Sequence, residues 1–335
     1  MKVLFDHPDP FLFAHGGVQN QIEQTKGALE TLGVEVDFLR WWDDRQKPEI
    51  IHYFGRAHSN YVRLAHRKGI KVVMSALLSS VGARSSLSHA VQRAANGILG
   101  SVLPNMWVDR FGWASFRIAD RCTALTAWEG KLMREIFGTP AEKIRVVPNG
   151  VEQVFMDSPM ATRGPWLICT ATLTECKRVV ELAHAAARAR TPVWVLGKPY
   201  ADDDPYAREF MAAAAANREF VRYEGPVNDR RKLAAIYREA RGFVLLSTHE
   251  SLSLSALEAA ACECPLLLSD LPWAHTVFQD RAMFCPVVKD VETTASALRA
   301  FYDAAPTLKP PPKPATWLDV GRQLKDVYAE LLKPA

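Results

Sequence analysis

The sequence feature that most constrains the fold is a strand–loop–helix–strand pattern within residues 242–270. Residues 243–246 and 265–269 are largely continuous apolar runs, which is typical of parallel strands covered on both faces. The loop between them holds Glu250 and leads into a helix whose first turn is rich in serine. Ligands of such sheets bind at the carboxyl ends of strands, and the free N–H groups of a helix N-terminus attract phosphate. The segment therefore predicts an α/β fold with an anion-binding loop.

Length and composition indicate the number of domains and the class of protein. A chain of 335 residues is long for one core and indicates two domains of comparable size. A hydrophobic content of 48% and a charged content of 23% are typical of a soluble globular protein. The sequence has no run of about 20 apolar residues, and residues 1–6 read as a strand rather than a signal peptide. We expect a cytoplasmic protein.

The six cysteines predict neither disulfides nor a metal site. None of them forms a C-x-x-C pair, and most lie in apolar segments, so buried free thiols in a reducing compartment are expected. Cys262 and Cys264 have no matching His or Cys pair elsewhere. Asp202, Asp203 and Asp204 read as the start of a helix rather than as metal ligands.

The stretch 50–117 combines positive charge with aromatic side chains. Residues 50–108 contain seven Lys or Arg and no Asp or Glu, and residues 106–116 are rich in aromatic and apolar groups. Peripheral contact with an anionic membrane surface would use both properties. The alternatives are a solvated basic face and a stripe that packs into its own domain. No nucleic-acid partner is expected.

Alternating strand and helix patterns fill the rest of the chain and predict doubly wound domains. Gly16 and Gly17 open the first helix, and Gly33 closes it in a left-handed conformation. The strands predicted in the first half are residues 1–6, 34–39, 50–55, 70–75, 122–127 and 144–148. Those predicted in the second half are residues 166–170, 193–197, 220–227, 243–246 and 265–269. Helices are predicted from residue 87 to 102, up to Gly138, and from residue 317 to 332.

Glu250 and Glu258, eight residues apart, resemble the E-x7-E element of retaining glycosyltransferases of the GT-B fold, in family 4 (group 1). The segments 247–250 and 257–262, together with Asp270, also match this family. The Gly16-Gly17 pair, Lys177 and residues 143–151 match it elsewhere in the chain.

The resemblance implies two facing Rossmann-like domains with a cleft between them. The expected boundaries are residues 1–158 together with a C-terminal helix, 317–335, for an N-terminal acceptor-side domain. Residues 159–304 would form the domain that binds the nucleotide-sugar, and residues 305–316 a proline-rich linker.

The resemblance also implies roles for particular residues. Glu250 and Lys177 are expected to be catalytic, with Lys177 neutralising the leaving diphosphate. Glu258 is expected to bind the ribose. The other residues expected to bind the donor are Gly16, Gly17, Thr172, Arg178, Gly197, Val227, Ser251, Leu252, Ser253 and Leu254. The chain departs from the family where Thr172 replaces an Arg and where Ser75-Ala76-Leu77 lacks a His, and Arg178 would supply the missing charge.

The function implied is a retaining hexosyltransferase of polysaccharide or glycolipid synthesis. It would move a sugar from a UDP- or GDP-linked donor to a glycan or lipid-linked acceptor, without metal or other cofactor. A sugar-nucleotide epimerase of the same fold and a catalytically degenerate nucleotide-sugar-binding protein remain alternatives. A dinucleotide oxidoreductase is disfavoured because no G-x-G-x-x-G follows the first strand.

Overall fold

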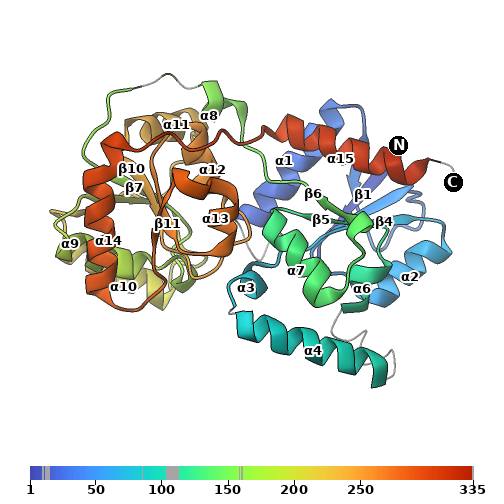
Figure 1. The fold of residues 1–335 in the computed structure, drawn as a ribbon. Coiled ribbons are helices and arrows are strands. Elements are labelled where there is room, and N and C mark those ends of the chain that lie inside the picture. The colour runs from blue at the N-terminus through green and yellow to red at the C-terminus, as the bar shows by residue number, and fades with distance from the viewer. Residues whose placement is uncertain are drawn as a thin grey trace. The chain divides into compact units, whose positions relative to one another are not determined.

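The computed structural model describes residues 1–9, 11, 16–84, 86–102, 113–157, 159 and 161–333 (Figure 1). The chain forms two compact units, Met1–Asn149 with Trp317–Ala335, and Gly150–Thr316. The division falls at residue 149, whereas the sequence suggested 158, and residues 305–316 belong to the second unit. Backbone pairing explains this difference. The N–H of Val151 donates to the carbonyl of Ala315 at 2.9 Å, so the segment after residue 149 pairs with the segment before residue 317.

Among the described residues, the first unit contains a parallel sheet of six strands in the order β2-β1-β3-β4-β5-β6. The strands are β1 Lys2–Asp6, β2 Glu35–Phe38, β3 Ile50–Phe54, β4 Lys71–Ser75, β5 Arg121–Ala124 and β6 Ile144–Val146. The chain adds strands first on one side of β1 and then, from β3 onward, on the other side. Doubly wound sheets bind ligands at such a switch point, which here lies between β1 and β3.

The helices of the first unit include one contributed by the C-terminus. They are α1 Gly17–Thr31, α2 Ser59–Arg67, α3 Ser79–Gly82, α4 Ser86–Val102, α6 Trp113–Ile118, α7 Ala127–Phe137 and α15 Trp317–Leu332, with the 3-10 turn η1 Ala141–Lys143. Helix α15 lies on α1 (Figure 1). Gly321 permits the close approach, since a Cβ there would lie 3.0 Å from the Cβ of Ala28.

The second unit repeats the architecture, with the strand order β12-β11-β10-β7-β8-β9 in the described part of the chain. Its strands are β7 Leu167–Thr170, β8 Val193–Leu196, β9 Val221–Tyr223, β10 Gly242–Leu245, β11 Leu266–Ser269 and β12 Met283–Cys285. Its helices are α8 Gln153–Asp157, α9 Val179–Arg188, α10 Pro205–Ala216, α11 Arg230–Glu239, α12 Leu254–Ala261, α13 Pro272–Phe278 and α14 Val291–Ala304. The 3-10 turns are η2 Glu175–Lys177, η3 Gln279–Arg281 and η4 Ala305–Thr307. Strands β10 and β11 are buried along their whole length, as their apolar runs predicted.

Most predicted elements are confirmed, and the exceptions have local causes. Gly33 and Gly138 adopt the positive φ expected of helix-closing residues. The predicted strand 220–227 is wrong beyond Tyr223, because Gly225 turns the chain at φ 79° and Pro226 has no N–H to donate. Strand β12 was not predicted, since three residues give too short a pattern.

Some predictions concern residues whose structure is not described. They include Pro104, at which the sequence predicts that the helix over residues 87–102 ends, and the residues 106–111 of the aromatic stretch. Within the described part of the chain, no helix is both long enough and apolar enough to cross a membrane.

A buried polar network fixes α15 to the first sheet. The Nδ1 atom of His52 lies 2.5 Å from the hydroxyl of Tyr328 on α15, and its Nε2 atom lies 2.5 Å from the hydroxyl of Ser75. Ser75 in turn contacts the hydroxyl of Thr123. Burial lowers the pKa of His52 to about 3, so the imidazole is neutral in the folded protein.

This network predicts a pH-dependent contribution to stability. In the unfolded chain His52 takes up a proton near its ordinary pKa of 6.5, whereas in the folded chain it does so only near 3. The folded state therefore loses stability as the pH falls below 6.5, by about 2 kcal/mol at pH 5. His52→Gln should melt lower than the wild type at pH 7, and the difference should narrow toward pH 5. A difference that stays constant across this pH range would contradict the assignment.

Candidate functional site

Two loops of the second unit meet at the carboxyl ends of β7 and β10. These neighbouring strands form the switch point of this sheet, because the chain adds its later strands on opposite sides of them. Residues 171–178 follow β7, and residues 246–253 follow β10. The N–H of Thr248 donates to the carbonyl of Cys176 at 2.8 Å, and the sulfur of Cys176 lies 3.5 Å from Nε2 of His249. These contacts hold the two loops side by side.

The two residues predicted to be catalytic form an ion pair between these loops. The ammonium of Lys177 donates to Oε1 of Glu250, which also accepts a 2.8 Å hydrogen bond from the hydroxyl of Ser247. Burial of Lys177 opposes its charge, but the charge and hydrogen bond of Glu250 outweigh burial and raise the pKa of Lys177. Lys177 is therefore a cation at neutral pH, and both side chains stay partly accessible, at 25% for Lys177 and 13% for Glu250.

Arg178 lies next to Lys177 but makes different contacts. It occupies the left-handed region at φ 53°, between η2 and α9, and its side chain is buried. Its guanidinium donates to the carbonyl of Val288, and its Nε atom lies 3.8 Å from Glu181. Its charge is thus directed toward α9 and the segment after β12, whereas that of Lys177 is directed toward Glu250.

Gly197 brings the end of β8 against the loop after β7. Its φ is 150°, and a Cβ at this position would lie 1.8 Å from the carbonyl oxygen of Ala171, so only glycine fits. Thr172, in the same loop, is partly exposed. Val227 is also partly exposed and lies in the segment between β9 and α11. Thr172, Gly197 and Val227 therefore lie in segments that follow β7, β8 and β9.

The serine-rich segment forms the start of α12, as the sequence predicted. Ser253 is the N-cap, and its hydroxyl accepts a 3.3 Å hydrogen bond from the N–H of Ala256. Leu254 is the first helical residue, and Ser251 and Leu252 are buried just before it. The hydroxyl oxygen of Ser251 is buried and has no hydrogen-bond partner among the described residues.

Glu258, on α12, takes part in a buried network that the sequence did not predict. Its Oε1 atom accepts from Arg230, and its Oε2 atom accepts from the hydroxyl of Tyr237 at 3.3 Å. Arg230 also donates to Glu152 at 2.7 Å and covers the ring of Phe155 at 4.7 Å. Burial raises the pKa of Glu258, while the charge of Arg230 opposes this rise.

A sequence signal for Arg230 existed but was missed. Helix α11 begins with Arg230, Arg231 and Lys232, although the positive end of the helix dipole disfavours cations in the first turn. A cation in such a position indicates an acidic partner elsewhere. The partner is Glu258, which lies 28 residues further along the chain.

Gly16 and Gly17 belong to the first unit. Gly16 has a φ of 138° and is the N-cap of α1, which begins at Gly17. The carbonyl of Gly16 accepts from the N–H of Asn20 at 3.1 Å. The two glycines thus lie at the carboxyl edge of the first sheet, as predicted.

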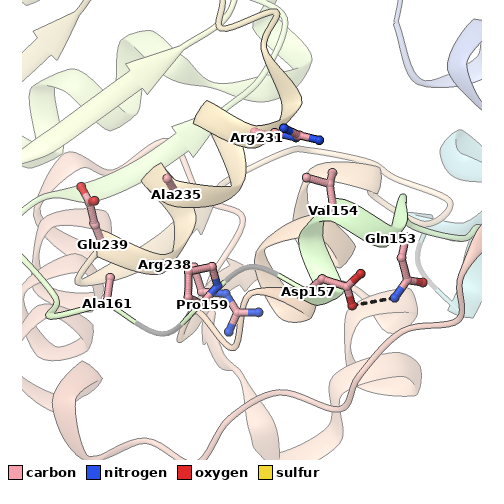
Figure 2. Close-up of a pocket in the computed structure, with 9 residues that line it drawn as sticks. All are labelled: Gln153, Val154, Asp157, Pro159, Ala161, Arg231, Ala235, Arg238 and Glu239. Carbon is pink, nitrogen blue, oxygen red and sulfur yellow. Dashed lines mark hydrogen bonds between the residues drawn. The ribbon is translucent and has the colours of Figure 1, made fainter.

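A separate pocket of about 570 Å³ lies between α8 and α11 (Figure 2). Gln153 and Asp157 of α8 line it, joined by a 2.7 Å hydrogen bond, together with Arg231 and Ala235 of α11. It includes none of the predicted site residues. Among the described residues, no cluster of three or more His, Cys, Asp or Glu side chains is arranged to hold a metal ion.

Comparison with family models assigns both units. Residues 17–150 match a glycosyl transferase 4-like domain, and residues 164–304 match the glycosyl transferases group 1. The chain belongs to the group 1 glycosyltransferases. The segment with Lys177, Glu250 and Glu258 lies inside the second match.

Curated relatives of this group 1 glycosyltransferase share about half of its chain. A GDP-mannose:cellobiosyl-diphosphopolyprenol alpha-mannosyltransferase of Xanthomonas oryzae pv. oryzae is 25% identical over 178 residues, 51% of this chain and 46% of the relative. A D-inositol 3-phosphate glycosyltransferase of Frankia alni is 29% identical over 181 residues, 48% of this chain and 44% of the relative. The chain thus spans about half the length of the curated relatives it matches.

Solved structures resemble the group 1 glycosyltransferase over almost its full length. Sucrose-phosphate synthase from Thermosynechococcus elongatus has a TM-score of 0.71 at 15% identity, covering 98% of both chains. Anabaena HepE in complex with UDP and glucose has a TM-score of 0.61 at 12% identity, covering 98% of this chain and 99% of that one. This likeness establishes the predicted GT-B fold, with two Rossmann-like doubly wound domains.

The Arg230 network predicts a specific loss of stability. Arg230→Ala leaves the buried Glu258 without its counter-ion, and because the guanidinium is 34% exposed we expect a cost of roughly 1–2 kcal/mol at pH 7. Arg231→Ala, on the exposed side of the same helical turn, is the matched control and should leave the melting temperature unchanged. Without Arg230 the pKa of Glu258 rises further, so protonation relieves the loss as the pH falls toward 4.5. Equal melting temperatures of both variants would show that the pair does not stabilise the fold.

Proposed function

We propose that the protein is a retaining glycosyltransferase that moves a sugar from a UDP- or GDP-linked donor to a glycan or lipid-linked acceptor. The observation that carries this proposal is the Lys177–Glu250 pair, placed by two loops at the switch point of the second sheet. Relatives and neighbours add support, since one relative is named for GDP-mannose and one neighbour holds UDP and glucose.

Glu258 is proposed to bind the ribose of the donor. A carboxylate has about four lone-pair sites, of which Arg230 and Tyr237 use two. The remaining sites suit the two hydroxyls of a vicinal diol. Arg230 would hold the carboxylate ionised and oriented, and Val227 would lie near the base.

Lys177 is proposed to neutralise the diphosphate as it leaves, and Glu250 to bind sugar hydroxyls and stabilise positive charge at the anomeric carbon. The N–H groups at the start of α12 would support the same charge. Thr172 and Gly197 would border the diphosphate. We assign the phosphate charge to Lys177 rather than to Arg178, whose guanidinium is directed toward Val288.

In the proposed reaction the bond between the anomeric carbon and the phosphate oxygen breaks, and the nucleoside diphosphate leaves with the electron pair. The acceptor oxygen then bonds to the same face of the sugar. Its proton passes to the departing phosphate, so the reaction needs neither a metal nor a redox cofactor.

Nucleotide binding and turnover test these roles. UDP or GDP at a hundredfold excess over its Kd should stabilise the wild type by about 2.7 kcal/mol, measured by thermal shift. Glu258→Gln should lose most of this shift. Glu250→Gln should keep it but release no nucleoside diphosphate when donor and acceptor are supplied. Glu239→Gln, an exposed carboxylate of the same unit, is the control.

Other outcomes of this experiment would favour the alternatives. Interconversion of donor sugars without an acceptor indicates an epimerase, and binding without turnover across an acceptor panel indicates a binding protein. A nucleotide shift that survives Glu258→Gln would contradict the proposed site.

We also propose that α4 contacts an anionic membrane, which would place the protein at the inner face of that membrane. Leu87 and Val91 are 74% and 62% exposed, and Ala90 and Ala94 beside them are exposed too. The helix thus presents these apolar side chains to solvent. Within the predicted stripe 106–116, by contrast, Phe116 packs into its own unit and stacks on Phe137.

Polar side chains attach the other side of α4 to its own unit. His89 lies 2.7 Å from the carbonyl of Val81, and Asn96 donates to the carbonyl of Ile136 on α7 at 2.8 Å. Helix α4 lies beside α7 (Figure 1). Arg84 and Arg93 are exposed near the apolar face. Apolar side chains flanked by cations are what anionic lipid surfaces attract.

Vesicle sedimentation tests the membrane proposal. The wild type should bind phosphatidylglycerol vesicles better than phosphatidylcholine vesicles, and added salt should weaken this binding because it screens the cations. A Leu87→Asp/Val91→Asp double variant should lose most of the binding. Met211→Asp, at an apolar position of the second unit that is 40% exposed, should not. Equal binding of both lipids, or no effect of the double variant, would refute α4 as the contact.

A further inference from the structure

Two adjacent tryptophans of the first unit point into solvent. Trp41 is 86% exposed and Trp42 68%, and their rings are perpendicular with centroids 5.6 Å apart. The N–H of Asp43 donates to the carbonyl of Arg40 at 2.9 Å, so the tryptophans occupy the two central positions of a tight turn. Such positions usually hold small polar residues, and leaving two indoles there exposes a large apolar surface.

Ion pairs and hydrogen bonds hold the backbone of this turn in place. Arg40 forms ion pairs with Asp37 at 2.6 Å and with Asp43 at 3.1 Å. The side chain of Gln46 accepts from the N–H of Arg40 at 2.8 Å and donates to the carbonyl of Phe38 at 3.0 Å. These bonds fix the backbone that carries the two indoles before any ligand arrives, which reduces the entropy lost on binding.

The turn lies at the ligand-binding edge of the first sheet. Phe5 of β1 and Phe38 of β2 are register partners at the carboxyl ends of parallel strands, and the N–H of Leu39 donates to the carbonyl of Phe5 at 2.8 Å. Phe11, in the segment between β1 and α1, packs edge-on against Phe38 with centroids 6.0 Å apart. The tryptophan turn therefore follows directly on a strand end that contacts Phe11.

Local charge selects the kind of ligand. Residues 35–49 hold five acidic and three basic side chains, whereas residues 50–108 hold seven basic and no acidic ones. An anionic lipid surface suits the second stretch and not the first. A neutral sugar suits the first, because its C–H face packs on an indole while its hydroxyls bond to carboxylates and guanidinium groups.

We propose that Trp41 and Trp42 form a subsite for a neutral sugar ring of the acceptor. This inference rests on the proposed glycosyltransferase function, because only that function identifies the bound sugar as part of the acceptor. Sugar binding by the two indoles is nevertheless measurable without any transfer reaction.

The test uses the full chain with 15N-labelled tryptophan, titrated with cellobiose, maltotriose and mannobiose. At least one of these sugars should shift the indole N–H resonances of Trp41 and Trp42, assigned from the Trp41→Phe and Trp42→Phe spectra. The resonance of Trp273, which is buried in the second unit, should not move. The Trp41→Ala/Trp42→Ala variant should bind the sugar with roughly tenfold lower affinity or worse.

Two results would overturn the inference. In one, no sugar of the panel moves either resonance. In the other, phosphatidylglycerol vesicles move both and the sugars do not, which would make the turn a membrane contact.

The nucleotide thermal shift separates this inference from the proposed function. The double alanine variant should keep the full shift with UDP or GDP, because Glu258 and Val227, which are proposed to bind the ribose and the base, lie in the second unit. Nucleotide stabilisation without any sugar-dependent resonance shift refutes only the subsite. Sugar-dependent shifts without nucleotide stabilisation leave the subsite intact and refute the donor site.

Discussion

The candidate site depends on one interaction, the ion pair between Lys177 and Glu250. Both residues lie in loops that follow buried parallel strands, and the hydrogen bond from Thr248 to Cys176 holds those loops together. The carboxylate of Glu250 raises the pKa of Lys177 and so keeps the ammonium charged in a partly buried place, where an unpaired charge would be costly. Before a donor binds, each of the two charges already has a partner. Under the proposed function, the negative diphosphate and the polar sugar of the donor would interact with both members of the pair.

Unusual backbone conformations occur where two segments approach closely or where a helix ends sharply. At position 197 the residue is glycine, because a side chain there would overlap the carbonyl of Ala171. Arg178 and Glu263 adopt positive φ without being glycine, at 53° and 57°. Glu263 follows α12 in the conformation that a helix-closing glycine would take. Such residues persist because the surrounding structure fixes them.

The first unit separates two kinds of surface by charge. Helix α4 combines exposed apolar side chains with arginines, and the turn at Trp41 and Trp42 combines exposed aromatic rings with acids. Under the two proposals, the charges beside each apolar surface would decide whether it accepts a lipid phosphate or a neutral sugar hydroxyl. On the opposite side of α4, polar contacts of His89 and Asn96 fix which face is exposed.

Sequence patterns alone predict every described strand except β12, the ends of α1 and α7 at glycines, and the positions of Glu250 and Lys177 after strands. These follow from short-range rules, namely apolar runs, glycine caps such as Gly33, and strand-to-helix order. The pairing of Arg230 with Glu258 and the contact of Tyr328 with His52 follow only from the packed fold. Such pairs join residues from separate elements, so their geometry depends on how strands and helices pack, and no local pattern encodes it.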